Sequence, residues 1–239
     1  MSNKLKLCVV VCFLLSISCD DDEPVNSHQG LSKPGFGVTD ADGNFYETIV
    51  LMEGSDAQEW MASNLRTTKY ANGDPIANVT DDTWQDLQTG AWCYYGNDPE
   101  MDARFGKLYN GWAAGDHRNL CPNGWRPPTY YELYLLAQYL GGDDIAGGAF
   151  KEEGTSNWVA PNADATNLSD LAFLPGGYRE GYVFDYFDKA GRQGRYWGAG
   201  APFESGHEFY ELSNQDGKLA YGGMAANGLG FSCRCLREK

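Results

Sequence analysis

The feature that most constrains this fold is residues 120–129, LCPNGWRPPT, together with the helix that follows them. Three prolines and a glycine fix the backbone of this segment and exclude helix within it. Thr129 then has the position of an N-cap, and Glu132 three residues later completes a capping box. The next apolar residues have the i, i+3, i+4, i+7 spacing of one buried helical face, namely Leu133, Leu136, Ala137 and Leu140. With two glycines at 141–142 to end it, the sequence predicts a helix over 130–140.

The first 18 residues have the features of a secretory signal. Lys4 and Lys6 form a short basic region, and residues 7–15 are apolar, too short a run to span a bilayer as a helix. Small residues precede Cys19, which is the order of a bacterial lipoprotein signal with Cys19 as the lipidated residue. The alternative is an ordinary signal peptide in which this cysteine has no such role.

An acidic run, DDDE at residues 20–23, follows Cys19 directly. Such a run is usually a solvated tether, and it also resembles the acidic export signal of surface-exposed lipoproteins of Bacteroidetes. We therefore expect an outer-membrane protein that faces the cell exterior and contacts the membrane only through the acyl chains, such as palmitate, of its lipid anchor. The predicted division is a signal peptide (1–18), a lipidated cysteine with a flexible acidic stalk (19–37) and one folded domain (38–239).

The charge and the aromatic content limit the function classes. The net charge is −15, so no basic surface would offset phosphate repulsion, and we expect no nucleic-acid partner. The 30 glycines, 15 tyrosines and 7 tryptophans indicate many short segments joined by loops. The oligomeric state does not follow from the sequence.

The predicted elements are those of an α+β domain. Besides 130–140 we expect helices at 105–114 and 143–153, and one helical turn at 83–87. A hairpin is expected over 38–46, with its turn at Asp42-Gly43. The expected strands are 46–52, 59–65, 91–95, 181–187, 195–197, 207–212, 218–221 and 230–236.

Two groups of residues suggest disulfide bonds or a metal site. The cysteines that remain beyond Cys19 are even in number, in an oxidising compartment, which predicts disulfides; they are Cys93, Cys121, Cys233 and Cys235. Three pairings are open, although the last two cysteines face the same side of a predicted strand and would not easily bond each other. Buried thiols are the alternative. Asp40 and Asp42 in the hairpin suggest calcium, against a plain turn, because the rest of an EF-hand is missing.

Six motifs in order resemble one family. They are WMASNLRTTKY (60–70), TGAWCYY (89–95), GKLYN (106–110), CPNGWRPPT (121–129), LPGGYR (174–179) and GFSCRC (230–235). Together they resemble the Fibrobacter succinogenes major paralogous domain, a family of secreted and lipid-anchored proteins that is similar to the C-type lectin-like and formylglycine-generating-enzyme folds. The resemblance implies an α+β, C-type lectin-like domain with two short-to-medium helices, several short antiparallel strands, long loops on one side and chain ends close together.

The resemblance also implies a disulfide pattern. In that fold a cysteine at the helix start is bridged to one in the last strand, which here is Cys121 with Cys235. Cys233 stands where the family commonly has an aliphatic residue, which leaves Cys93 as its candidate partner.

The sequence lacks the motifs on which the chemistry of these related folds depends. The calcium-dependent lectin tripeptides Glu-Pro-Asn and Trp-Asn-Asp are missing, and so are a nucleophile elbow, a His-Glu-x-x-His zinc motif and a phosphate loop. The formylglycine-generating enzyme binds copper through a cysteine pair, whereas at least one of Cys233 and Cys235 is expected to be structural. We therefore predict no enzyme, no cofactor and no metal beyond the calcium alternative.

We expect a non-catalytic binding or adhesion module for a glycan or protein ligand, because aromatic faces stack on sugars and anchor interfaces. The alternatives are a divergent enzyme related to formylglycine-generating enzymes and a purely structural surface protein. Phe203, His207 and Tyr221 lie in glycine-rich surroundings, so we expect these three residues to be exposed and to bind the ligand. Large aromatics such as Tyr196 and Trp197 are expected in the core. The other candidates are Tyr182, Phe184, Tyr186, Phe209 and Tyr210.

Overall fold

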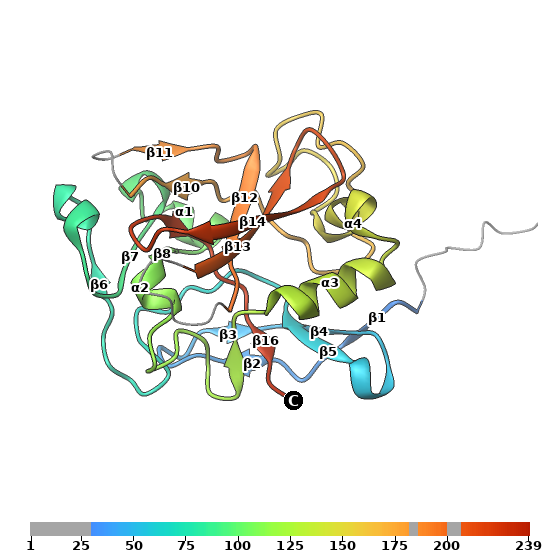
Figure 1. Ribbon diagram of the computed structural model, residues 1–239, viewed down its shortest axis with the longest axis horizontal. Coiled ribbons are helices and arrows are strands. Elements are labelled where there is room, and N and C mark those ends of the chain that lie inside the picture. The colour runs from blue at the N-terminus through green and yellow to red at the C-terminus, as the bar shows by residue number, and fades with distance from the viewer. Residues whose placement is uncertain (1–29, 182–185, 200–206) are drawn as a thin grey trace, which may run out of the picture.

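The computed structural model describes residues 30–181, 186–199 and 207–239. Over these residues the chain forms an α+β fold of four helices and four mostly antiparallel sheets (Figure 1). The predicted signal peptide, the lipidated cysteine and most of the stalk lie outside the described residues. Among the helices that are described, none is both long enough and apolar enough to cross a membrane.

The first and last strands of the described chain share one antiparallel sheet. Its order is β1–β4–β5–β16–β9. The bounds are β1 Ser32–Pro34, β4 Thr48–Leu51, β5 Gln58–Met61, β16 Leu236–Arg237 and β9 Trp125–Arg126. Because β9 belongs to the proline-rich segment before the long helix, this sheet joins both chain ends to the start of that helix.

A six-stranded sheet forms a second layer, in the order β11–β10–β15–β8–β7–β6. The bounds are β11 Phe187–Asp188, β10 Tyr178–Arg179, β15 Gly230–Phe231, β8 Leu108–Asn110, β7 Ala91–Cys93 and β6 Ala77–Asn78. Only β6 and β7 pair in parallel within the described sheets. The predicted hairpin is confirmed as β2 (Val38–Thr39) and β3 (Phe45–Tyr46).

The third sheet carries the most regular strands. It consists of β12 (Gln193–Trp197), β13 (His207–Ser213) and β14 (Leu219–Ala225), all antiparallel. The register shifts between Glu208 and Tyr210, which is a β-bulge. Gly223 on β14 has a φ of +67°, a left-handed conformation that glycine adopts without strain. A bulge of this kind bends the hairpin and changes where its side chains point.

The long helix forms as its local signals predict. It is α3 (Tyr130–Tyr139), and its capping box is present: Glu132 N donates to Thr129 Oγ1 at 3.3 Å and Thr129 N donates to Glu132 Oε2 at 2.8 Å. Arg126 also binds the Glu132 carboxylate through two nitrogens, at 2.7 and 2.8 Å. The proline-rich segment is thereby fastened to the helix that it introduces.

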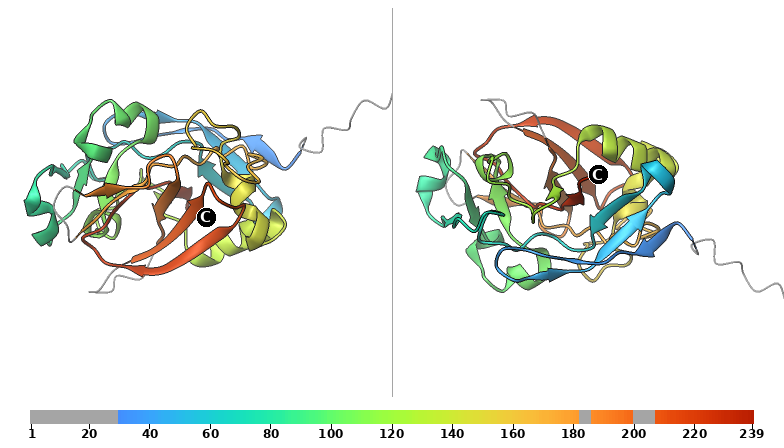
Figure 2. Two further views of the ribbon diagram at one scale, coloured as in Figure 1. Left: turned by 90° about the horizontal axis from the view of Figure 1, so that it is seen from above. Right: turned by 90° about the horizontal axis from the view of Figure 1, so that it is seen from below.

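The other helices are short. They are α1 (Met101–Phe105), α2 (Gly111–Ala114) and α4 (Asp143–Phe150), with 3₁₀ turns η1 (Gly54–Asp56), η2 (Asp82–Asp86) and η3 (Tyr95–Asn97). The prediction of a helical turn near 83–87 is confirmed by η2. Helix α4 lies beside α3, next to the β12–β13–β14 sheet, at one end of the molecule (Figures 1 and 2).

Two of the predicted secondary-structure elements, one helix and one strand, are interrupted in the structure. The predicted helix over 105–114 is interrupted by β8, because Leu108–Asn110 pairs with β7 and β15 and the strand pairing overrides local helix propensity. The predicted strand over 230–236 is also interrupted. Residues 233–235 belong to no strand and connect β15 in one sheet to β16 in another.

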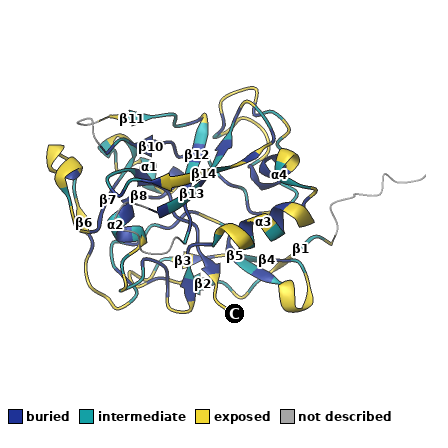
Figure 3. Cartoon of the chain, viewed as in Figure 1, coloured by how far each residue is buried: buried dark blue, intermediate teal, exposed yellow. Residues whose placement is uncertain are grey.

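The core is rich in aromatic side chains. The predicted inner face of α3 is buried, with Leu133, Leu136, Ala137 and Leu140 each at most 5% exposed, and it packs beneath α4 (Figure 3). Tyr196 and Trp197 are fully buried, as expected. Tyr196 stacks on Tyr210 with ring centroids 5.3 Å apart.

One of the two implied disulfides is present. Cys121 and Cys235 are bonded across a sequence separation of 114 residues. The second implied bridge, between Cys93 and Cys233, is wrong, because both residues are buried thiols in different parts of the core. Cys93 on β7 packs in a small cluster with Trp84, whereas Cys233 lies in the larger cluster that contains the disulfide.

Candidate functional site

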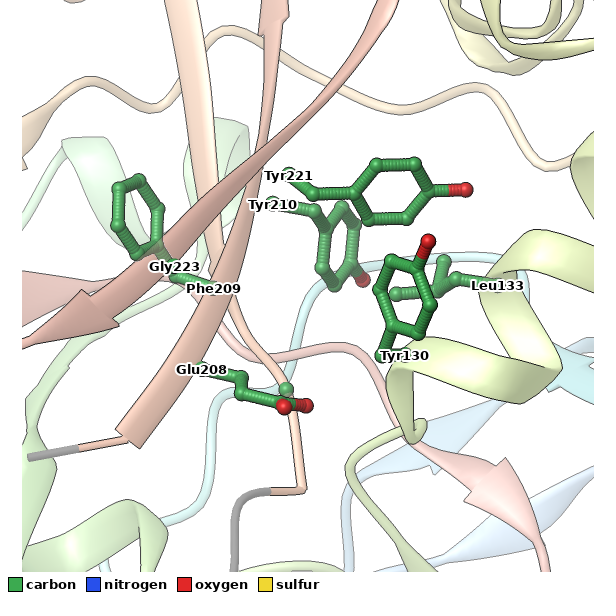
Figure 4. Close-up of a pocket in the computed structure, with 8 residues that line it drawn as sticks. Tyr130, Leu133, Glu208, Phe209, Tyr210, Tyr221 and Gly223 are labelled. Atoms are coloured by element: carbon green, nitrogen blue, oxygen red, sulfur yellow. The ribbon is translucent and has the colours of Figure 1, made fainter.

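The candidate site is a pocket between the start of α3 and the β13–β14 hairpin, with a volume of about 210 Å³. Its lining residues come from four separate parts of the chain. They are Tyr130, Leu133, Gly198, Glu208, Phe209, Tyr210, Tyr221 and Gly223. We call it the tyrosine pocket, because the rings of Tyr130, Tyr210 and Tyr221 converge on it (Figure 4).

Local structure places each ring. Thr129 caps α3, so Tyr130 is the first helical residue and its ring rises from the helix start toward the hairpin (Figure 4). Tyr210 and Tyr221 are register partners on β13 and β14, directly beside the bulge. The ring of Phe209 points to the other side of the sheet, where it packs 5.1 Å from Phe231, so this residue lines the pocket without offering its ring (Figure 4).

The aromatic contacts form a continuous surface. The rings of Tyr130 and Tyr221 meet edge to face, with centroids 4.7 Å apart. Tyr134, one helical turn after Tyr130, stacks on it with centroids 6.2 Å apart and is 37% exposed. Tyr130 itself is 48% exposed. Accessible, roughly parallel rings of this kind offer apolar faces to a ligand while their hydroxyl groups stay hydrated.

The pocket also contains polar groups that the protein does not fully satisfy. The hydroxyl of Tyr210 is buried and has no hydrogen-bond partner in the described part of the chain, although the residue is only 1% exposed. An unpaired buried hydroxyl costs about 1–3 kcal/mol. Because this hydroxyl is buried in the core, it is not presented to a ligand, and Tyr210 lines the pocket with its ring. Glu208 adds a carboxylate at the edge of the pocket (Figure 4).

Burial and a nearby acid keep the pocket tyrosines protonated. Burial raises the pKa of Tyr221, and Asp143, whose Oδ1 accepts from the Tyr221 hydroxyl at 3.2 Å, raises it further. Burial likewise raises the pKa of Tyr210 well above its ordinary value. Both groups are therefore neutral phenols at physiological pH, able to donate and accept hydrogen bonds.

The three predicted ligand-binding residues are not brought together. Tyr221 lines the tyrosine pocket, and Phe203 lies outside the described residues. The prediction that His207 is exposed was wrong, because it is only 5% exposed. Its ring packs 6.2 Å from Trp197 and lies so close to Gly115 that a side-chain Cβ there would be 2.0 Å from Cε1 of the histidine.

Sequence reasoning missed Tyr130 and Glu208. The signal for Tyr130 was available: Tyr130 and Tyr134 are four residues apart, and they face away from the apolar stripe of α3. Nothing in the sequence distinguishes Glu208 among 33 acidic residues. Tyr210 was one of many aromatic candidates, and its place at the pocket depends on the bulge.

His207 predicts a pH dependence of stability. Burial lowers its pKa below the ordinary value of 6.5, so the unfolded chain binds a proton that the folded chain does not. The contribution of His207 to the free energy of unfolding is complete above pH 6.5. It decreases as the pH falls from 6.5 toward the pKa of this side chain in the folded state. Each unit of lowering is worth about 1.4 kcal/mol, which corresponds to roughly 3–6 °C in Tm for a domain of this size. We expect His207→Asn to flatten the Tm profile between pH 7.5 and 5.

The exposed His117 supplies the control, since its side chain is 93% exposed. His117→Asn should leave the slope of Tm against pH unchanged. An unchanged slope in His207→Asn would mean that other groups cause the acid sensitivity.

A cluster of three sulfurs lies away from the tyrosine pocket. The sulfur atoms of Cys121, Cys233 and Cys235 lie within 4.8 Å of one another, and all three residues are buried. Burial raises the pKa of the Cys233 thiol to about 12. Since Cys235 is bonded to Cys121, a copper site of the cysteine-pair type has one thiol here rather than two.

The predicted hairpin turn holds its carboxylates with protein donors. Asp40 Oδ1 accepts from the backbone of Asp42 and Asn44, each at 2.9 Å, and Asp40 Oδ2 accepts from Tyr46 at 2.6 Å. Asp42 accepts from Thr68 and lies 3.2 Å from the Lys69 amine. These contacts are typical of an Asx turn. They match the plain turn that the sequence offered as the alternative to a calcium site.

The chain was compared with known proteins. The model of one family, described as the Fibrobacter succinogenes major domain, matches residues 56–237. Neither a curated protein nor a solved structure matches the chain. The matched range contains all six motifs and every residue that lines the tyrosine pocket.

Proposed function

Because the chain belongs to the Fibrobacter succinogenes major domain family, we propose that it is a lipid-anchored surface protein whose domain binds a glycan without catalysing a reaction. The observation that carries the proposal is the tyrosine pocket. Its rings offer apolar faces to a sugar, while the Glu208 carboxylate at its edge offers hydrogen bonds to sugar hydroxyls.

The proposal includes the anchor and the position in the cell. Its support is the sequence: a signal ending before Cys19, an acidic run and a polar stalk. An acidic, mutually repulsive surface suits a protein displayed at the cell exterior. We also propose that the fold is C-type lectin-like. Support comes from the disulfide between the start of α3 and the last strands, and from the sheet that the first and last strands share.

The absence of catalysis is part of the proposal. Glycoside hydrolysis uses two carboxylates that flank the scissile bond. Among the described residues that line the pocket, Glu208 is the single acid. Asp143 contacts the Tyr221 hydroxyl from outside the lining. Turnover of a bound oligosaccharide would contradict this part of the proposal and favour a divergent enzyme.

The test uses the mature chain on a glycan array, followed by titration of the glycans that bind. Tyr221→Ala is expected to weaken binding about 5- to 30-fold, because it removes an aromatic contact worth roughly 1–2 kcal/mol. Tyr131→Ala is the matched control, since Tyr131 lies on the same helix, is 64% exposed and does not line the pocket. Equal losses in both variants would contradict the placement of the site.

Two further arms of the same experiment separate the alternatives. Binding should persist in chelator, because the proposed contacts need no calcium; binding lost in chelator would point to a metal site. Intact cells should bind the glycan, and Cys19→Ala should move that binding from the cells to the medium. A failure of any glycan to bind would replace the sugar with a protein ligand.

A protein ligand is the second candidate, and one observation favours it. Exposed tyrosines continue along α3 beyond the pocket, with Tyr131 at 64% and Tyr139 at 39% exposure. Tyrosine is enriched at protein interfaces because it supplies a large contact area at low entropic cost. Capture of a surface protein that Tyr131→Ala weakens as much as Tyr221→Ala would support this candidate over the glycan.

A further inference from the structure

A second pocket of about 210 Å³ shares no lining residue with the tyrosine pocket. It lies between the segment that follows β5 and helix α1. Its lining includes Ser63, Arg66, Asp102, Arg104, Phe105 and Leu174. We call it the arginine pocket.

The walls of the arginine pocket are held by buried contacts. Asn64 Nδ2 donates to Phe105 O at 2.8 Å, and Lys107 N donates to Leu65 O at 3.2 Å. Gly106 has a φ of +72°, and a Cβ there would lie 2.8 Å from Leu65 O, so the two walls approach as closely as glycine permits. The pocket is therefore preformed rather than dependent on a mobile loop.

Arg66 brings a positive charge that has no acid partner among the described residues. Its Nε is buried and has no hydrogen-bond acceptor among the described residues. Its guanidinium has one other described interaction, with the ring of Tyr46 at 5.7 Å, and it forms no ion pair in the described chain. Because Arg66 is only half-buried and lines the pocket, the charge of its guanidinium is available to an acceptor from outside the protein.

Arg104 supplies a second guanidinium on the opposite wall. Its Nε donates to Asn157 Oδ1 at 2.7 Å and its Nη2 donates to Ser156 O at 3.3 Å, so both partners are neutral. Its Cζ lies 4.7 Å from the ring centroid of Phe105. These contacts fix the side chain and leave its charge uncompensated.

The acid of the pocket is already paired. Asp102 Oδ1 lies 2.9 Å from Nζ of the buried Lys107. The pocket thus presents two positive charges that form no ion pair within the described ranges, in a chain whose net charge is −15. Ser63, whose hydroxyl has no described partner, adds a further donor at the rim.

We infer that the arginine pocket binds the carboxylate of a small acidic ligand. The planar fork of an arginine matches a carboxylate through two parallel hydrogen bonds. Phe105 and Leu174 give the pocket an apolar wall, which suits a carboxylate on a carbon skeleton better than an inorganic anion that is hydrated on every side. A uronic acid or another small organic acid has this combination of groups.

The test compares D-glucuronate with D-glucose, which has the same ring without the carboxylate. Calorimetric titration of the mature chain at low ionic strength should show binding of glucuronate and none of glucose. Arg66→Gln should weaken glucuronate binding about 10- to 100-fold, because it removes a charge-assisted pair. Arg66→Lys keeps the charge without the fork and should give an intermediate loss.

Arg192→Gln is the matched control, since Arg192 is exposed, makes the same charge change and lies outside the pocket. It should leave glucuronate binding unchanged. Tyr221→Ala should also leave it unchanged, which separates this inference from the proposed glycan site. Thermal unfolding of each variant identifies any that fails to fold, and Arg104→Gln then provides a second test of the same pocket.

Three outcomes would overturn the inference. Equal binding of glucose would show that the carboxylate is not recognised. Equal weakening by Arg192→Gln would show that only the net charge matters. Binding of inorganic phosphate as tightly as glucuronate would show that the apolar wall does not select a carbon skeleton.

Discussion

Replacing both Cys121 and Cys235 by alanine is expected to lower the free energy of unfolding by roughly 3–5 kcal/mol. The bond closes a loop across 114 residues, so its loss frees the unfolded chain over about half of the sequence. It also releases the proline-rich segment that precedes α3 from the connection between β15 and β16, which joins two sheets. The measurement is urea unfolding followed by tryptophan fluorescence, with the wild type under oxidising and reducing conditions as reference.

The third sulfur makes the single variants unequal. In Cys235→Ala, Cys121 and Cys233 remain, and their sulfurs lie within 4.8 Å of each other, so an oxidant can join them across a loop of nearly the same length. In Cys121→Ala, the remaining pair of this cluster is two residues apart and can restrain no long loop. We therefore expect Cys235→Ala to be the more stable of the two after oxidation. Equal stability would mean that Cys233 cannot replace Cys235.

Replacing Lys151 by methionine is expected to destabilise the protein by about 3–5 kcal/mol. The Lys151 residue is fully buried, and its Nζ donates to the backbone oxygens of Ala163, Ser213 and Asp216 at 2.7, 2.9 and 2.7 Å. Burial lowers the pKa of Lys151 to about 8, so at neutral pH the amine keeps its proton and its three donors match three acceptors. Methionine has a similar length and leaves all three oxygens unpaired.

The position of Lys151 extends the effect to the candidate site. Lys151 directly follows α4, and its amine connects this position to the loop at Ala163 and to the turn between β13 and β14. These two strands form the hairpin that carries Tyr210 and Tyr221. We expect Lys151→Met to weaken ligand binding at the tyrosine pocket as well as stability. Lys218→Met is the control, because Lys218 is 61% exposed and pairs with an exposed Asp144. A loss below about 1 kcal/mol in Lys151→Met would show that water satisfies the three oxygens instead.

Some of this architecture follows from the sequence because its causes are local. The capping box of Thr129 and Glu132, and the apolar spacing after it, act within two turns of helix, so α3 is predictable. The turn at Asp42-Gly43 determines the β2–β3 hairpin in the same way. The bond between Cys121 and Cys235 followed from the order of six motifs, since family resemblance carries long-range information that spacing does not.

The errors fall where distant segments meet. Local propensity favoured a helix through Leu108–Asn110, but this segment is a strand because it has partners on both sides, β7 and β15. Cys233 and Cys235 were expected two residues apart on one strand. They lie instead in the connection between two sheets. The glycine-rich surroundings of His207 suggested exposure, whereas its ring fills the space above Gly115.

The sequence by itself determined the acidic character, the main helix and the family, and it is the basis of the proposed lipid anchor. Only the tertiary structure decided which side chains form a site. Tyr130 meets Tyr221 across 90 residues of chain, and Arg66 faces a pocket with Arg104, because sheet pairing and a β-bulge bring them together. A local pattern reports what a residue does to its neighbours in sequence, and a binding site depends on neighbours in space.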